Sequence, residues 1–184
     1  MTEGGFRVLV VCTGNICRSP IAEQLLRART SEGGVAFSSA GTGATPGAAM
    51  PGEAAELSRA YGGEPDGHVA RRITRALIDE SDLVLTAARE HRGAVVELSP
   101  RASRHTFTIL QFARLLASVD PVDLAAAGTP AEVVAAAAAR RGYARPGEDD
   151  IPDPYRRSFA EYQVAAALID DAVAQIATAL DRRG

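Results

Sequence analysis

Residues 7–20 have the sequence RVLVVCTGNICRSP, and this stretch sets the expectation for both the fold and the chemistry. Its first part, Arg7–Val11, is an apolar, β-branched run without alternation, which is typical of a strand covered on both faces. The residues from Cys12 to Arg18 include Gly and Asn and predict a loop. Ser19 and Pro20 then have the residue types preferred at a helix N-cap and at the first helical position. The stretch predicts a buried strand, a loop and a helix in direct succession.

Strand and helix signals continue to alternate along the chain. Short apolar runs predict further strands over Val35–Ser38, Leu83–Leu85 and Thr106–Leu110. Helical patterns predict helices over Glu53–Tyr61, Thr74–Glu80 and Ala87–Leu98. This alternation favours an α/β fold in which helices wrap a parallel sheet, with ligands bound at the carboxyl ends of the strands.

The last third of the chain holds an Ala-rich region and the clearest helical pattern. Ala117–Arg141 predicts a helical insertion, and Tyr143–Arg157 predicts a charged, Pro-rich loop. Beyond the loop, apolar residues recur at spacings of three and four: Phe159, Tyr162, Ala166, Ile169, Val173, Ile176 and Leu180. This stripe predicts a helix packed against the sheet. Without a repeat or a clear linker, residues 1–184 are expected to form one domain, with the Ala-rich insertion around residues 117–150.

Composition narrows the range of functions. All 20 basic residues are Arg, against 23 acidic residues and a net charge of −3. The lack of Lys excludes Schiff-base and pyridoxal chemistry and any phosphate loop that depends on a Walker lysine. The basic residues form no long run, so neither a nucleic-acid surface nor an anionic-membrane surface is expected.

Cysteine and histidine usage points to a reduced protein without a metal. Cys12 and Cys17 are the two Cys of the chain, and its three His are scattered without metal-ligand spacing. No signal peptide is visible, and the apolar runs fall short of the roughly 20 residues that a spanning helix needs. We therefore expect a cytoplasmic protein that enters no membrane and needs no metal or cofactor.

The loop after the first strand has the features of an anion site that contains a nucleophile. Successive backbone N–H groups from Thr13 to Ser19 can surround an anion, and the helix N-terminus adds partial positive charge. Arg18 supplies a planar guanidinium that binds two oxygens of a phosphate group. The same field favours the thiolate form of Cys12, which is then a nucleophile for phosphorus. Cys17 does not fit this pattern, because Glu23 rather than Arg lies six residues after it.

Five motifs, in order along the chain, carry a family resemblance. They are Cys12–Glu23, Ser38–Thr42, Gly67–Thr74, Ser81–Leu85 and Asp153–Tyr155. Together they resemble the low-molecular-weight protein tyrosine phosphatases of the bacterial type. The resemblance implies a single-domain, four-stranded parallel sheet flanked by helices, similar to flavodoxin, with the phosphate loop between the first strand and the first helix. It also implies metal-free hydrolysis of phosphomonoesters, phosphotyrosine in proteins above all, through a phosphocysteine.

The resemblance also implies a role for each site residue. Cys12 would attack phosphorus, Arg18 would hold its oxygens, and Asp153 would act as general acid and then as base. Pro152 and Pro154 would restrict where the Asp153 carboxyl points. The phosphate-binding residues would be Thr13, Gly14, Asn15, Ile16, Cys17 and Ser19, with Tyr155 at the pocket mouth. Ser19 would hydrogen-bond the Cys12 sulfur, and the residues that brace the loop would be Asn15, Ser39 and His68.

Other polar residues are expected to lie outside the chemistry. Asp120 also precedes a Pro, but it lacks the aromatic residue that follows Pro154 in the motif around Asp153. Glu148–Asp150 is interpreted as a solvated acidic loop. His91 and His105 are interpreted as surface or packing residues.

Cys17 supports two interpretations. It lies close enough to Cys12 in the loop to form a reversible disulfide that protects the thiolate from irreversible oxidation. The alternative is a buried structural Cys. The comparison that separates them is the recovery of the wild type and of Cys17→Ser from peroxide with dithiothreitol.

The substrate is predicted less narrowly than the chemistry. Thr42–Thr45 offers only small side chains where the family usually has a large one, and Arg156 follows Tyr155 where another aromatic is frequent. A thiol-coupled arsenate reductase, a phosphoarginine phosphatase and a phosphatase for a small metabolite are alternatives on the same scaffold, and an inactive phosphate-binding module is a fourth. Ile16 favours an aryl ester, because phosphoarginine relatives tend to have Thr there. A bacterial tyrosine kinase is the partner that the resemblance suggests.

Overall fold

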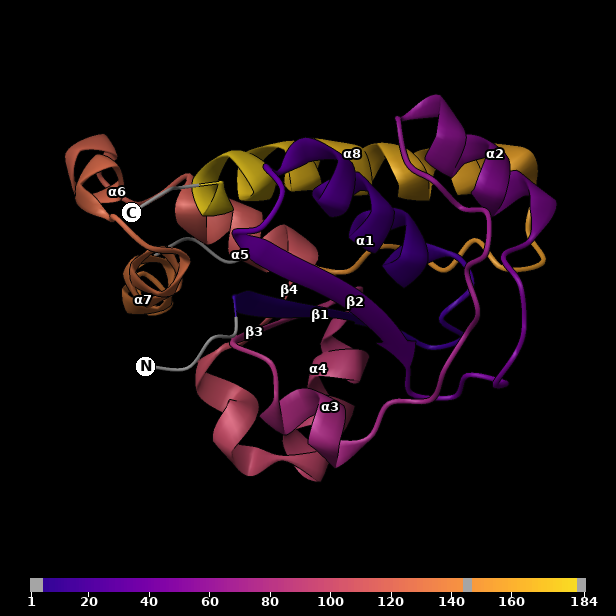
Figure 1. Cartoon of the computed structure of the whole chain (residues 1–184), viewed down its shortest axis with the longest axis horizontal. Coiled ribbons are helices and arrows are strands. Elements are labelled where there is room, and N and C mark those ends of the chain that lie inside the picture. Colours follow the sequence, from indigo (N-terminus) through magenta and orange to yellow (C-terminus); the bar gives the residue numbers. More distant parts are fainter. Residues whose placement is uncertain (1–4, 144–146, 182–184) are drawn as a thin grey trace.

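The computed structural model describes residues 5–143 and 147–181, which form one parallel sheet with helices on both faces (Figure 1). The sheet has four strands in the order β2-β1-β3-β4. Their bounds are β1 (Phe6–Cys12), β2 (Val35–Gly41), β3 (Leu83–Thr86) and β4 (Thr106–Thr108). The α/β fold with a four-stranded parallel sheet is confirmed.

The central strand β1 explains the apolar run that opens the chain. It pairs with β2 at one edge and with β3 at the other, and core residues cover both of its faces. Val8 and Val10 belong to the larger core cluster, and Leu9 and Val11 belong to the smaller one. Successive side chains of a strand point to opposite faces. A strand that is buried on both faces therefore has apolar residues at consecutive positions.

Helices form a layer on each face of the sheet (Figure 1). The helices on one side are α1 (Arg18–Arg29), α2 (Gly52–Ala60), α5 (Ile109–Leu116) and α8 (Phe159–Leu180). The helices on the other side are α3 (Arg75–Asp79) and α4 (Arg89–Leu98), and a 3₁₀ turn over Pro100–Arg104 follows α4. The parallel direction of the strands brings all four carboxyl ends to one edge, where β1 runs into the loop at residues 12–18.

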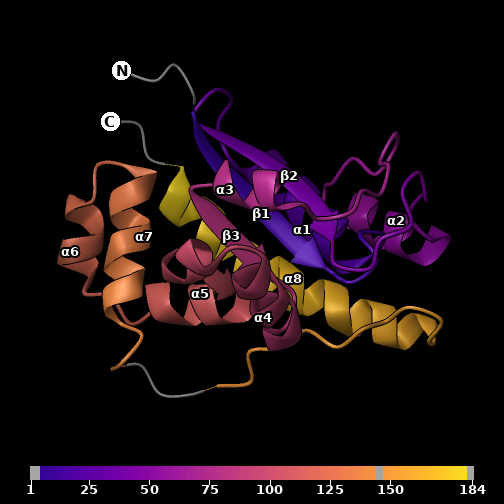
Figure 2. The same ribbon diagram turned by 90° about the horizontal axis from the view of Figure 1, so that it is seen from below.

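Two short helices form the Ala-rich region and lie at one end of the molecule, next to α5 (Figure 2). They are α6 (Pro121–Ala126) and α7 (Pro130–Ala139), and each has Pro at its start. Asp120 is the N-cap of α6, and its carboxylate accepts a hydrogen bond from the Val122 N–H. This second Asp-Pro pair therefore starts a helix.

The last helix, α8, is a core helix. By length and hydropathy it is the one described helix that would be long enough to cross a membrane, but it packs against α1 and α5. Six of the seven stripe residues are buried; the exception is Phe159, with 40% of its surface exposed at the first turn. The predicted burial of the stripe is confirmed for those six residues, but the main contacts of α8 are with α1 and α5 rather than with the sheet.

Two local predictions are wrong. The strand predicted over Thr106–Leu110 ends at Thr108, and α5 begins at Ile109 with the Thr108 hydroxyl accepting a hydrogen bond from the Gln111 N–H. A short apolar run fits a strand or a buried helix equally well, and here the cap decides. Ser19 is not an N-cap, since α1 already begins at Arg18 and the Ser19 hydroxyl is engaged in the loop.

Candidate active site

Residues 12–18 form a loop that curls around the sulfur of Cys12. Cys12 ends β1 and is buried, and its Sγ lies 3.3 Å from the backbone N of Asn15, which donates to it. Asn15 has φ 53°, in the left-handed region that Asn tolerates better than most residues. This left-handed conformation bends the loop backbone so that the Asn15 N–H reaches the sulfur of Cys12.

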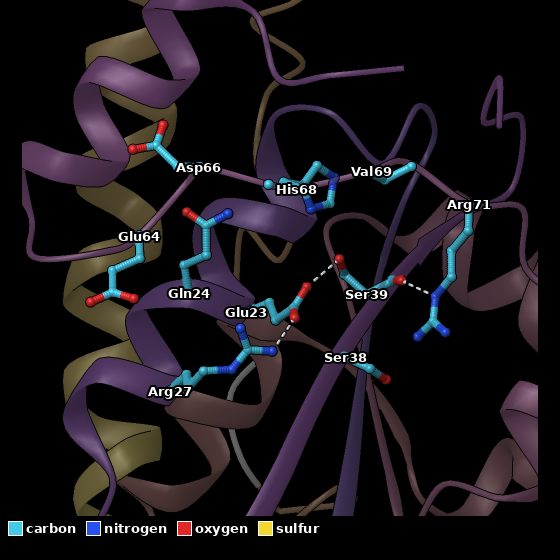
Figure 3. Close-up of a pocket in the computed structure, with 11 residues that line it drawn as sticks. Glu23, Gln24, Arg27, Ser38, Ser39, Glu64, Asp66, His68, Val69 and Arg71 are labelled. Carbon is cyan, nitrogen blue, oxygen red and sulfur yellow. Dashed lines mark hydrogen bonds and ion pairs between the residues drawn. The ribbon is translucent and has the colours of Figure 1, made fainter. Parts of the chain in front are cut away.

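A relay of buried hydrogen bonds leads from the sulfur to the far side of the loop. The Oγ of Ser19 lies 3.0 Å from Cys12 Sγ. The side-chain amide of Asn15 donates to Ser19 Oγ at 3.0 Å and to Ser39 Oγ at 2.8 Å. The Ser39 hydroxyl donates to the carboxylate of Glu23 at 2.5 Å (Figure 3). We call this set, Cys12–Ser19–Asn15–Ser39–Glu23, the relay.

The direction of each bond in the relay follows from one backbone contact. The Arg71 N–H donates to Asn15 Oδ1 at 2.9 Å, which orients the amide so that its NH₂ meets the two serines. Each serine oxygen therefore accepts from Asn15 and keeps its own hydrogen for another partner. For Ser39 that partner is Glu23, and for Ser19 it is the sulfur of Cys12. A thiolate at Cys12 thus has Ser19 as a donor.

Further contacts brace the loop from behind. The Nε2 of His68 lies 2.7 Å from the backbone oxygen of Asn15. The Arg71 side chain donates through Nε to the Ser39 carbonyl at 2.8 Å (Figure 3). On the third side, Thr42 N donates to the Cys12 carbonyl at 2.9 Å.

Arg18 is the cation of the site and is almost fully buried, with 3% of its surface exposed. Its Nη1 donates to the carbonyl of Ile151 at 3.0 Å, and its Nη2 lies 3.4 Å from Thr13 Oγ1. Nη2 also meets Asp153 Oδ2 at 3.0 Å. The Nε of Arg18 is buried and has no hydrogen-bond partner within the described residues. A buried N–H without a partner is costly, and a phosphate oxygen would satisfy it.

Asp153 and Tyr155 stand at the rim. The side chain of Asp153 is half-exposed, and the Tyr155 N–H donates to its Oδ1 at 3.3 Å. Tyr155 is 44% exposed, and the Arg156 guanidinium carbon lies 5.2 Å from the centre of its ring. The carboxyl group, the ring and the Arg18 guanidinium therefore meet at one opening.

A cavity of about 390 Å³ joins these groups. It is lined by Cys12, Thr13, Gly14, Ile16, Cys17, Arg18, Gly43, Thr45, Ala48, Asp153 and Tyr155. Sequence reasoning named eight of these eleven residues. Gly43, Thr45 and Ala48 come from the loop after β2; the expected small side chains at residues 42–45 include the first two. The side chains of Asn15 and Ser19 do not line this cavity and bond to each other. Ser39 and His68 line a second cavity behind the loop, of about 350 Å³ (Figure 3).

Cys17 is a buried thiol on the wall of the active-site cavity. Burial, with the nearby Cys12, raises the pKa of Cys17 from 9.0 to about 12. Its Sγ lies 4.0 Å from the hydroxyl of Tyr162 in α8. Cys17 is therefore a neutral thiol at physiological pH, and the disulfide with Cys12 stays a prediction.

The structure corrects the interpretation of several polar residues. Of the two interpretations of His91, surface or packing, the surface one is excluded: His91 is buried, and its Nε2 lies 2.8 Å from Thr13 Oγ1. In the acidic loop, Asp149 is buried and paired with Arg114, so the loop is not simply solvated. Glu23 was missed as a member of the relay, although it lies four residues after Ser19 on a predicted helix and hence on the same face.

The described residues contain no group of three or more His, Cys, Asp or Glu that could hold a metal ion. The groups that converge on the cavity are a thiol, a guanidinium, a carboxyl and backbone N–H donors. This set suits the transfer of a phosphoryl group to sulfur.

Comparisons with known proteins agree with this geometry. The family model for low molecular weight phosphotyrosine protein phosphatases matches residues 7–126. The tyrosine phosphatase Wzb of Escherichia coli K12 is 30% identical over 95% of each chain. The tyrosine phosphatase AmsI of Erwinia amylovora has a TM-score of 0.72 at 25% identity over 99% of each chain. The arginine phosphatase YwlE of Geobacillus stearothermophilus has a TM-score of 0.71 at 27% identity, over 94% of this chain and 91% of its own. The chain therefore belongs to the low molecular weight phosphotyrosine protein phosphatase family, as its motifs predicted.

Proposed function

We propose that this protein hydrolyses phosphotyrosine in proteins through a covalent phosphocysteine at Cys12. The observation that carries the proposal is that Arg18, whose buried Nε has no partner in the described chain, lines the same cavity as Cys12. A bound phosphate group would satisfy this donor and present phosphorus to the thiolate. The apolar Ile16 and the Tyr155 ring suit an aromatic leaving group.

The first step forms the S–P bond and breaks the bond from phosphorus to the phenolic oxygen. The Cys12 thiolate supplies the electron pair, and Asp153, in its protonated form, gives its proton to the departing oxygen. Arg18 and the loop N–H groups hold the three remaining oxygens while charge spreads over them. Tyrosine leaves, and phosphate remains on sulfur.

The second step reverses the roles. Asp153, now a carboxylate, takes a proton from water as the water oxygen attacks phosphorus. The S–P bond breaks, inorganic phosphate forms, and the electron pair returns to the sulfur. Ser19 supports this departure, because its hydroxyl donates to the developing thiolate at 3.0 Å. Nothing in the cycle requires a cofactor.

The proposal also covers the domain organisation, the cellular location and the substrate of the protein. Residues 1–184 would act as one phosphatase domain, with residues 117–150 as an insertion that carries α6 and α7. The protein would work in the cytoplasm, on a phosphotyrosine protein such as a bacterial tyrosine kinase. A second candidate is phosphoarginine, because an arginine phosphatase is among the similar structures. Ile16 argues against phosphoarginine as the substrate, because its apolar side chain lines the cavity.

Steady-state hydrolysis of four substrates tests the proposal: p-nitrophenyl phosphate, a phosphotyrosine peptide, a phosphoserine peptide and phosphoarginine. Cys12→Ser serves as the blank. Fast turnover of both aryl esters, inhibited by vanadate and lost in Cys12→Ser, is expected. Preferred turnover of phosphoarginine would move the assignment to that substrate. Slow turnover of all four by folded protein would contradict the proposal and favour arsenate or a small metabolite.

A further inference from the structure

His91 is a buried histidine beside the phosphate loop, and the two-step mechanism gives it no task. It lies in the first turn of α4, just beyond the carboxyl end of β3, and 2% of its surface is exposed. Its Nε2 lies 2.8 Å from Thr13 Oγ1 and 3.4 Å from the carboxylate of Glu90. Its Nδ1 is buried and has no partner in the part of the chain that the structure describes. The Nε2 atom therefore makes the polar contacts of the ring.

The hydroxyl that His91 holds lies against the guanidinium of Arg18. Nη2 of Arg18 is 3.4 Å from Thr13 Oγ1, and Nη1 donates to the carbonyl of Ile151. The Ile151 backbone is fixed, since its N–H donates to the Ala87 carbonyl at 2.8 Å. The Thr13 side chain, in contrast, has more than one staggered χ1 rotamer open to it, and a second hydrogen-bond partner selects the one that faces Arg18. His91 is that partner.

The surroundings of the His91 ring favour its neutral form. Burial, and then the charge of Arg18, lowers the pKa of His91 below its ordinary 6.5, although the carboxylates of Glu90, Asp150 and Asp153 act in the opposite direction. A neutral imidazole places no second cation next to Arg18. It can also donate to the Thr13 hydroxyl or accept from it, according to which nitrogen carries the hydrogen.

We infer that His91 is a positioning residue: through the hydroxyl of Thr13 it holds the Arg18 guanidinium in the orientation that receives the phosphate group. This inference rests on the proposed function, because it takes phosphate as the ligand of Arg18. Arg18 binds the same oxygens in the bound substrate and in the transition state. Loss of the His91 contact is therefore expected to weaken phosphate binding and to lower kcat/KM more than kcat.

The test compares His91→Leu with His91→Gln. Leucine removes the hydrogen bond, whereas the glutamine amide is neutral and offers both a donor and an acceptor near the position of Nε2. The Ki of inorganic phosphate should rise about fivefold in His91→Leu, the size expected for one neutral hydrogen bond. In His91→Gln it should stay within about twofold of the wild type, since the bond is replaced. Thr13→Val should match His91→Leu, and the double variant should lose little more, because both changes remove one contact.

His105 supplies the matched control. It is a second histidine whose pKa is lowered mainly by burial, and it directly precedes β4, at the opposite edge of the sheet from the loop. His105→Leu should change stability and leave the phosphate Ki unchanged. An unchanged Ki in both His91→Leu and Thr13→Val, or equal losses in folded His91→Leu and His91→Gln, would overturn the inference. A wild type that binds phosphate in calorimetry but hydrolyses no ester would overturn the proposed function instead, and the same calorimetry would still decide the role of His91.

Discussion

Asp153 and Arg18 form an ion pair across the opening of the active site, with 3.0 Å between Oδ2 and Nη2. The proposed acid therefore occupies part of the guanidinium that the phosphate group needs. A phosphate dianion can bind Arg18 only when the Asp153 carboxylate is displaced or protonated. Asp153 can give way because its side chain is half-exposed, whereas that of Arg18 is buried. The free enzyme thus keeps its buried cation paired until a phosphate group replaces the carboxylate.

Asp153→Asn should separate two roles of Asp153: it donates a proton to the leaving oxygen, and it competes with phosphate for Arg18. Loss of the acid should lower kcat for a phosphotyrosine peptide by about 10²- to 10³-fold. The loss should be smaller for p-nitrophenyl phosphate, because nitrophenolate leaves without much help from an acid. At the same time the Ki of inorganic phosphate should fall, because the competing carboxylate is gone. The basic limb of the kcat profile against pH should flatten.

Asp120→Asn is the control for Asp153→Asn, because Asp120 also precedes Pro but caps α6. Steady-state kinetics with both esters, and phosphate inhibition for each variant, measure the contrast. Equal losses for the two esters in Asp153→Asn would mean that another group protonates the leaving oxygen. A weaker phosphate affinity in that variant would mean that the ion pair does not compete with the ligand.

Glu23→Ala should weaken the relay from its far end. The Ser39 hydroxyl is buried and would lose its acceptor, which should destabilise the fold by about 1–3 kcal/mol. Ser39 would then hold Asn15 less firmly, and Asn15 orients the donor to the sulfur. We expect slower hydrolysis of the phosphocysteine, seen as a larger burst of product before the steady state.

Glu64→Ala is the matched control for Glu23→Ala, since both carboxylates line the cavity behind the loop but Glu64 is not part of the relay (Figure 3). Urea unfolding and rapid-quench kinetics should show the change in Glu23→Ala alone. If both variants behave alike, the charge of the cavity is responsible and the relay is not.

The sequence was sufficient for the parts of the fold and site that depend on neighbouring residues. The run Arg7–Val11 predicted a covered strand because both faces of β1 are buried. The loop and its nucleophile followed from the residues between Cys12 and Arg18. The predicted strand wrongly includes Ile109 and Leu110, because a short apolar run suits a strand or a helix and the Thr108 cap decides for the helix.

The missed residues depend on contacts between distant parts of the chain. His91 meets Thr13 across 78 positions, and no local pattern distinguishes this His from a packing residue. The burial of Asp149 likewise depends on Arg114, 35 positions earlier. Such contacts arise from the packing of β3, α4 and α5 around the loop. Glu23 is an intermediate case: helical spacing places it on the same face as Ser19, but its bond in the relay is to Ser39, 16 positions later.

The stability of the protein should fall as the pH decreases from about 7 to about 5.5. Burial lowers the folded-state pKa values of His91 and His105 below 6.5, so the unfolded chain binds more protons in this window. The free energy of unfolding then decreases as pH falls through the unfolded value, and levels off below the folded values. Asp79, Glu132 and Glu161 also have lowered pKa values, but their contributions are lost only at lower pH, below about 4.5.

Urea unfolding of the wild type and of the double variant His91→Gln, His105→Gln measures this dependence. The double variant should have a flatter profile between about pH 7 and pH 5.5, because it lacks the two groups that take up protons on unfolding. A wild-type profile that is already flat in this window would contradict the expectation. A slope that persists in the double variant would assign the protons to other groups.

Gly41→Ala should disrupt the phosphate loop, because Gly41 lies directly against the loop backbone. A Cβ atom at Gly41 would collide with the Thr13 carbonyl oxygen and would lie 2.8 Å from the backbone N of Asn15. Neither atom can retreat easily, since Asn15 is held by His68 and by the relay. We expect a loss of about 1–3 kcal/mol in the free energy of unfolding, the range for an overpacked site. The loss of kcat/KM should be larger than that destabilisation alone explains, because the loop carries the phosphate donors.

Gly43→Ala separates this collision from a general effect of adding a methyl group near the site. A Cβ atom at Gly43 would lie 3.6 Å from Thr13 Cγ2, which is an ordinary van der Waals contact. Gly43→Ala should therefore unfold at nearly the same urea concentration as the wild type and bind phosphate with similar affinity. Equal behaviour of the two variants would show that the loop backbone can shift away from Gly41. In that event, the packing of β2 against the loop would not be the cause of the contact between the Asn15 N–H and the sulfur of Cys12.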